Sequence, residues 1–245
     1  LPTVLSTVLV AHAFFLFETD LSAGQQIEYI GILSLIAILT YIFGTYLNDY
    51  CDQHFDRIHQ PFRPIPQGLI SSKSVLLLAL SYLFISIVLQ ALVFNFQTMA
   101  YYFALIILIT IYSFWHKNNP LAPVLMGMCR AGFIFCLSAY CLEIVDSTKE
   151  NYQVALRVTT YYDYLTVVLI YVASLTFVSK WLDFKPQIVE KFMSLFKIHP
   201  IGGLILFLCL HDAVWIGTLG SFALMLGPLV LFSVGYLLSR KTQAN

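Results

Sequence analysis

Long apolar stretches alternate with short polar segments along most of this 245-residue chain. A helix of about 20 apolar residues crosses the roughly 30 Å of a bilayer's hydrocarbon. Stretches of this kind cover residues 2–17, 27–48, 74–96, 99–115, 121–142, 162–182, 201–219 and 221–238. The pattern predicts an all-α, polytopic bundle of about eight transmembrane helices.

Composition supports the same interpretation. Hydrophobic residues make up 59% of the chain and charged residues 11%, whereas soluble proteins average about 25% charged residues. The mean hydropathy is +0.81. We therefore expect an integral, multi-pass membrane protein with one domain over residues 1–245. The net charge is zero and no basic patch is interleaved with aromatic residues, so we expect no nucleic-acid partner.

The positive charges predict the orientation. If the loop 49–73 is cytoplasmic, ten Lys and Arg residues share its side and two, Lys149 and Arg157, lie opposite. Such an excess marks the cytoplasmic face of a membrane protein. The ten are Arg57, Arg63, Lys73, Lys117, Lys180, Lys185, Lys191, Lys197, Arg240 and Lys241.

The connections have distinct characters. Three prolines between 57 and 72 predict a rigid, non-helical crossover, and residues 116–123 predict a tight turn. Residues 143–163 are polar, and we expect them to form an outer loop. The cytoplasmic loop 181–200 contains a short amphipathic pattern around 187–197.

An acidic cluster follows the span 27–48. On a helix, Asn48, Asp49, Asp52 and Asp56 fall at about 0°, 100°, 40° and 80°, so they share one face. Charges scattered by chance on a solvated helix end would not need a shared face. Oxygen ligands from carboxylates, completed by water and phosphate oxygens, suit Mg²⁺. The spacing favours a site for a Mg²⁺-bound diphosphate, and the solvated helix end is the alternative.

The pattern N-D-x-x-D-x-x-x-D at 48–56, followed by "RPIPQG" at 63–68, resembles the first signature of the UbiA superfamily of intramembrane prenyltransferases. A weaker resemblance extends over residues 112–130, and the number of predicted helices is also similar to that of the family. The resemblance implies a ring of eight or nine helices around a central cavity, open sideways to lipid and capped by two acidic cytoplasmic loops. It also implies Mg²⁺-dependent transfer of an isoprenoid from its diphosphate to a lipid-soluble, usually aromatic acceptor.

The family's second signature, D-x-x-x-D after the sixth span, is matched in part. Asp183 stands in the first position, but Gln187 stands in the second, and Glu190 is the next acid. Through the resemblance Asp183 joins Asp49, Asp52 and Asp56 as a catalytic residue and metal ligand. A second Mg²⁺ would have fewer ligands here than in the family pattern.

Diphosphate departure from an allylic carbon leaves negative charge, which metal ions and cations stabilise. We expect Asn48, Arg63, Lys117, Lys180 and Arg130 to bind the substrate diphosphate. Anchoring of the helix ends by positive charge is the alternative for the lysines. Arg130 lies inside a span, as does Asp212, and ionisable groups there usually face a partner or a cavity. We expect these two to contact each other or a shared polar cavity.

Two other functions are consistent with the sequence. A non-catalytic subunit or scaffold of a membrane complex could keep the fold and lose the second acidic signature. A transporter could use Arg130, His211 and Asp212 as a charge relay, but transporters often show repeated halves with broken helices, and no such repeat is evident.

Overall fold

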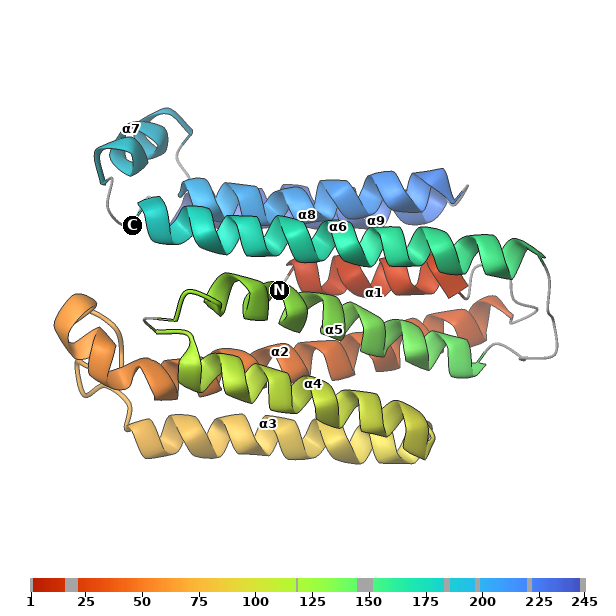
Figure 1. The fold of residues 1–245 in the computed structure, drawn as a ribbon, viewed down its shortest axis with the longest axis horizontal. Helices are drawn as coiled ribbons and strands as arrows, with labels where there is room; N and C mark the ends of the chain where they lie inside the picture. The colour runs from red at the N-terminus through yellow and green to blue at the C-terminus, as the bar shows by residue number, and fades with distance from the viewer. Residues whose placement is uncertain are drawn as a thin grey trace.

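The computed structural model describes residues 2–15, 22–117, 119–144, 152–182, 186–196, 199–219 and 222–242. Every regular element in these ranges is an α-helix, and most run nearly parallel to the long axis of the molecule (Figure 1). The helices are α1 (Pro2–Phe15), α2 (Ala23–His59), α3 (Ser72–Val93), α4 (Phe96–Trp115), α5 (Ala122–Ile144), α6 (Tyr152–Leu182), α7 (Pro186–Phe196), α8 (Pro200–Thr218) and α9 (Phe222–Thr242).

Eight of these described helices are apolar enough to account for the predicted spans. Six have the length and composition to cross a membrane, and α1 and α9 contribute shorter apolar segments. α7 is the amphipathic helix expected near 187–197. The predicted all-α, polytopic bundle is therefore confirmed.

Local sequence signals explain where α2 begins and ends. The Ser22 side chain accepts a hydrogen bond from the Gln25 amide, and Gln25 bonds back to Ser22, which forms a capping box. The helix then continues through the acidic residues to His59 and stops before Pro61, which has no amide hydrogen to donate. The non-helical crossover expected here is observed over residues 60–71.

The expected outer loop at 143–163 is wrong in extent. α5 continues to Ile144 and α6 begins at Tyr152, so much of this polar segment is helical. A helix satisfies its backbone hydrogen bonds within itself, so a polar segment is able to continue as a helix. The polarity of 143–163 therefore did not mark where these helices end.

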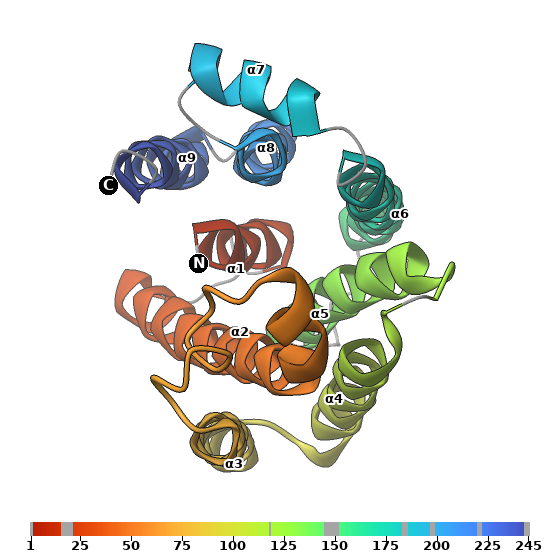
Figure 2. The same ribbon diagram turned by 90° about the vertical axis from the view of Figure 1, so that its left-hand side faces the viewer.

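α1 lies inside the ring that the other spans form (Figure 2). It packs against α2, α5, α8 and α9, and Val8, Val10 and Ala11 on it are completely buried. Its first turn starts near the middle of the long axis (Figure 1). Residues at the start of α1 therefore meet α5 and α8 deep within the bundle.

Candidate functional site

One end of the bundle collects the predicted acidic site. The connection from α2 to α3, the turn from α4 to α5, and α7 all lie at this end (Figure 1). α2 has 37 residues, about 55 Å at 1.5 Å per residue, so it is longer than the hydrocarbon requires. We call its acidic residues and the side chains that touch them the acidic end; it comprises Asn48, Asp49, Asp52, Asp56, Arg63, His116 and Lys117.

The four residues predicted to share a helix face do converge. The Asn48 amide Nδ2 donates to Asp52 Oδ2 at 3.0 Å. Asp52 and Asp56 are 3% and 2% exposed, whereas the Asp49 side chain is 42% exposed. Buried carboxylates need partners, so the contacts of Asp52 and Asp56 decide what this site is able to bind.

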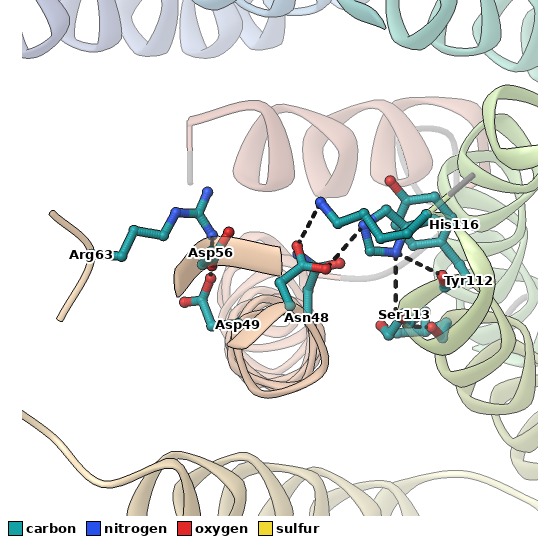
Figure 3. Close-up of polar contacts among 10 residues, drawn as sticks. Asn48, Asp49, Asp56, Arg63, Tyr112, Ser113 and His116 are labelled. Atoms are coloured by element: carbon teal, nitrogen blue, oxygen red, sulfur yellow. Dashed lines mark hydrogen bonds and ion pairs between the residues drawn. The ribbon is translucent and has the colours of Figure 1, made fainter. Parts of the chain in front are cut away.

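Arg63 connects two of these carboxylates. Its Nη1 lies 2.9 Å from Asp56 Oδ2 and 3.3 Å from Asp49 Oδ1 (Figure 3). The Arg63 side chain remains 39% exposed. One guanidinium therefore balances charge on two acids while part of it stays open to solvent or to a ligand.

The turn after Pro61 places Arg63 at this position. The Gln67 amide donates to the Arg63 carbonyl at 3.1 Å, and the Gly68 amide donates to the Ile65 carbonyl at 3.0 Å. Gly68 has a φ of 74°, a conformation that residues with a Cβ rarely adopt. The glycine in "RPIPQG" therefore has a backbone reason: it closes the turn that carries the arginine.

The turn between α4 and α5 supplies two more groups. Lys117 Nζ lies 3.1 Å from Asp52 Oδ2 and 4.1 Å from the centre of the Phe55 ring. His116 Nε2 lies 3.3 Å from Asp52 Oδ1. Lys117 was expected at this site, whereas His116 was not. Its position directly before Lys117 and one helical turn after Tyr112 was the available signal.

The acidic end has unused bonding capacity. Asn48 Oδ1, Asp52 Oδ1 and Asp56 Oδ1 are buried and accept no hydrogen bond, although buried oxygens normally have a donor. Oxygen atoms of carboxylates and amides are the ligands that Mg²⁺ takes, usually one or two carboxylates together with water and phosphate oxygens. These residues therefore fit Mg²⁺. No group of three His, Cys, Asp or Glu side chains in the described ranges is arranged to hold a metal by itself.

Part of the predicted site lies outside the described residues. Asp183 falls in an undescribed segment, as does the side chain of Lys180 at the end of α6. On α7, Gln187 and Glu190 are both exposed. The roles of Asp183 and Lys180 stay predictions.

Arg130 belongs to a second polar group, deeper in the bundle. Its Nη2 donates to the Thr3 carbonyl and to Thr7 Oγ1, both at 2.6 Å. No contact between Arg130 and the acidic end is found in the described part of the chain. Its role in diphosphate binding stays a prediction.

Asp212 lies in the same group. It accepts hydrogen bonds from Tyr164 at 2.8 Å and from Ser6. No ion pair joins it to Arg130 within the ranges described; both residues instead bond to the first two turns of α1. The expected direct contact is therefore not found in the described ranges, and a polar cavity shared by the two residues stays a prediction. We call this second polar group the mid-bundle cluster; it comprises Thr3, Ser6, Thr7, Arg130, Tyr164 and Asp212.

An apolar groove borders the mid-bundle cluster on one side. It has a volume of about 500 Å³ and lies between α6 and α8. His211 lines it, and His211 Nε2 accepts a hydrogen bond from Trp215 at 2.9 Å. No residue of the acidic end lines this groove.

The spacing of the acidic residues, the turn that carries Lys117 and the helical bundle are features that the chain shares with a known family of membrane proteins. The sequence profile of the UbiA prenyltransferase family matches residues 4–181. The chain belongs to the UbiA prenyltransferase family.

Particular relatives are known as well. The chain is 30% identical over 135 residues to a digeranylgeranylglyceryl phosphate synthase of Methanococcus aeolicus, covering 54% of this chain and 47% of the relative. It is 29% identical over 121 residues to the synthase of the same name from Methanopyrus kandleri, covering 49% of this chain and 44% of that one. These matches thus span about half the length of the relatives.

The fold also resembles that of a solved structure. That structure comes from work on the biosynthesis of digeranylgeranylglyceryl phosphate synthase in membranes, and it superposes with a TM-score of 0.55 over 97% of this chain and 92% of the other. The sequence identity is 14%. This likeness supports the fold alone.

Proposed function

We propose that this chain transfers an isoprenoid group from its diphosphate to a lipid-soluble acceptor within the membrane, with Mg²⁺ at the acidic end. One observation carries the proposal: three buried oxygens that accept no hydrogen bond, on Asn48, Asp52 and Asp56, lie beside the cations that contact Asp52 and Asp56, with His116 Nε2 3.3 Å from the oxygen of Asp52. Buried acceptors usually have a donor, so these oxygens are available to a ligand. Residues 1–245 would act as one transmembrane domain.

Most residues of the acidic end have a proposed role in binding the metal or the diphosphate. Asp52 and Asp56, with Asp49 and Asn48, would hold Mg²⁺. When bound, Mg²⁺ stabilises the negative charge of the departing diphosphate. Arg63 contacts Asp49 and Asp56, and Lys117 contacts Asp52. Both basic side chains are about two-fifths exposed, so each is able to contact phosphate oxygens from the solvent side. Asp183, Lys180 and Arg130 keep their predicted roles.

The names of the relatives bear on which molecule accepts the isoprenoid group. The relatives are named for a digeranylgeranylglyceryl phosphate, which favours an isoprenyl glyceryl phosphate as acceptor over the aromatic acceptor that the family resemblance implied. The acidic end would face the cytoplasm, because the described basic residues at that end include Arg57, Arg63 and Lys117.

A transfer assay tests the proposal. The full chain in lipid nanodiscs would receive labelled geranylgeranyl diphosphate, Mg²⁺ and either geranylgeranylglyceryl phosphate or a phenolic lipid. We expect a labelled lipid product and diphosphate release that both disappear with a chelator. No product with either acceptor and no diphosphate release would favour the scaffold alternative, in which the chain supports partner proteins of a membrane complex.

A further inference from the structure

A network of neutral polar side chains joins α2, α3, α4 and α5 inside the bundle. Each member is at most 2% exposed. We call it the hydroxyl network; it comprises Thr40 on α2, Ser86 and Gln90 on α3, Tyr102 on α4 and Tyr140 on α5. None of these side chains carries a charge, so the network does not serve to neutralise an ionised group.

Tyr102 is the member that connects α4 to its neighbours. Its hydroxyl donates to Ser86 Oγ at 3.0 Å and lies 3.1 Å from Thr40 Oγ1. The Gln90 amide donates to the same Ser86 oxygen at 3.3 Å, and its own oxygen accepts from Tyr140. One hydroxyl of α4 therefore contacts both α2 and α3.

α2 and α4 meet again at the acidic end, where Lys117 Nζ lies 3.1 Å from Asp52 Oδ2. Both helices end at this end of the bundle (Figure 1). At 1.5 Å per residue, Asp52 lies about 18 Å beyond Thr40 along α2, and Lys117 lies about 22 Å beyond Tyr102 along α4. The two helices are thus joined by polar contacts at two separate levels.

Apolar side chains pack between these two levels. Phe43 and Leu47 on α2 belong to a cluster with Ile106 and Ile109 on α4. Lipid tails are as apolar as these side chains, so burying them gives little driving force between helices, and apolar contact has no direction. A slip of one turn, about 5.4 Å, would exchange one apolar surface for a similar one. A buried polar contact is able to specify one register.

We propose that Tyr102 is a positioning residue for the acidic end: its hydroxyl, held by Ser86 and Thr40, fixes the register of α4 on α2. That register sets the turn that carries Lys117 beside Asp52. This inference rests on the proposed function. If the network served only to stabilise the bundle, its loss would lower the amount of folded protein without any dependence on Lys117.

The chain contains a matched control tyrosine. The Tyr101 hydroxyl accepts a hydrogen bond from Gln97 Nε2 at 3.0 Å, on its own helix. Tyr101→Phe therefore removes a hydroxyl from the neighbouring position without removing that of Tyr102. Tyr102→Phe keeps the buried ring, and Thr40 and Ser86 each retain another hydrogen-bond partner. We therefore expect both variants to fold.

Initial rates in the transfer assay, with the full chain in nanodiscs, test the inference. Tyr102→Phe should slow transfer roughly tenfold, the shift in register that the loss of about one hydrogen bond allows. Thr40→Val should have a similar effect, and Tyr101→Phe should leave the rate unchanged. Thermal midpoints identify any variant that fails to fold.

A double-mutant cycle supplies the decisive readout. The effects of independent changes at distant sites usually multiply to within about twofold. In a chain that already carries Lys117→Gln, adding Tyr102→Phe should cost less than about twofold more, because the contact that the register serves is already lost. A merely structural loss of active protein would multiply in full.

Each result has one interpretation. If the unmodified chain transfers the isoprenoid, a full rate in Tyr102→Phe overturns this inference alone. An equal loss in Tyr101→Phe, losses that multiply in the cycle, or a full rate in Lys117→Gln would overturn it as well. No transfer by the unmodified chain would refute the proposed function and, with it, this inference.

Discussion

The acidic end and the mid-bundle cluster both place charged groups in a largely apolar protein, yet their bonding differs. In the mid-bundle cluster, both oxygens of Asp212 accept hydrogen bonds, from Ser6 and Tyr164, and Asp212 is 1% exposed. In the acidic end, Asp52 and Asp56 each keep one buried oxygen without a donor. Both oxygens of the Asp212 carboxylate thus have hydrogen-bond partners in the protein, whereas Asp52 and Asp56 each have one oxygen that accepts no hydrogen bond.

This difference in hydrogen bonding indicates which polar groups stabilise the bundle and which are available to bind a ligand. Polar groups that are fully paired between helices contribute to helix association in membranes, and α1, α6 and α8 meet at Asp212. Unpaired buried acceptors cost free energy, which a ligand bound to Asp52 and Asp56 would offset. We therefore propose that Asp212, Ser6 and Tyr164 serve packing and that the acidic end serves binding, and the following substitutions test this contrast from both sides.

The largest effect is expected from Asp212→Ala. The change removes the acceptor of both Tyr164 and Ser6, and each buried hydroxyl left without an acceptor costs about 1–3 kcal/mol. Unfolding in detergent should show that loss of stability. Asp212→Asn keeps an oxygen for Tyr164 and should lose less. The protein that remains folded should transfer the isoprenoid at a normal rate; a stable but inactive Asp212→Ala would move the site into the bundle.

Asp52→Ala should show the opposite profile. We expect the transfer rate to fall at least about 100-fold, the usual result of removing one preorganised electrostatic group, while the thermal midpoint changes little. Initial rates with labelled donor measure the effect. Glu28→Ala is the matched control, because Glu28 is an exposed acid at the far end of the same helix. A rate within tenfold of the unmodified chain would contradict the role of Asp52.

Arg63→Ala should have a smaller effect on binding. Arg63 contacts both Asp49 and Asp56 and is proposed to meet phosphate oxygens, so pyrophosphate affinity should fall roughly tenfold, the value of one charge-assisted contact. Arg57→Ala, at an exposed neighbouring arginine, should leave the affinity unchanged. Equal losses in both variants would indicate a general charge effect instead of a specific contact.

The smallest effect on stability is expected from Asp49→Asn. The Arg63–Asp49 pair is 3.3 Å long with both side chains about two-fifths exposed, and exposed ion pairs contribute about 0–1 kcal/mol. The free energy of unfolding should change by less than about 1 kcal/mol, although Asp49 is a predicted Mg²⁺ ligand and transfer should fall. A destabilisation comparable to that of Asp212→Ala would remove the contrast between the two regions.

Periodicity and local signals predicted much of this molecule. Apolar length located the spans, and the spacing of Asn48, Asp52 and Asp56 on one helix was sufficient to place them on one face, since a single helix has known geometry. The prolines after His59 predicted the break that carries Arg63. These features depend on neighbours in the sequence, which is why sequence patterns find them.

Contacts between segments that are distant in the sequence were harder to predict. Nothing local to His116 indicates that its ring meets Asp52, 64 positions earlier in the numbering, because that contact requires α2 and α4 to pack first. Ser6 and Asp212 are separated by 206 residues, and their contact depends on where α1 lies in the bundle. The polarity of 143–163 was a poor guide to the helix end because a helix satisfies its own backbone hydrogen bonds whether its side chains are polar or apolar.

The most direct test of the account is the binding of an isoprenyl diphosphate to the acidic end as a function of Mg²⁺. Calorimetry with geranylgeranyl thiodiphosphate, a donor analogue that resists ionisation, would separate binding from chemistry. We predict binding to the unmodified chain that requires Mg²⁺ and is lost in Asp52→Ala but retained in folded Asp212→Asn. Binding that is independent of Mg²⁺ and unaffected by Asp52→Ala would contradict the assignment of the acidic end as the substrate site.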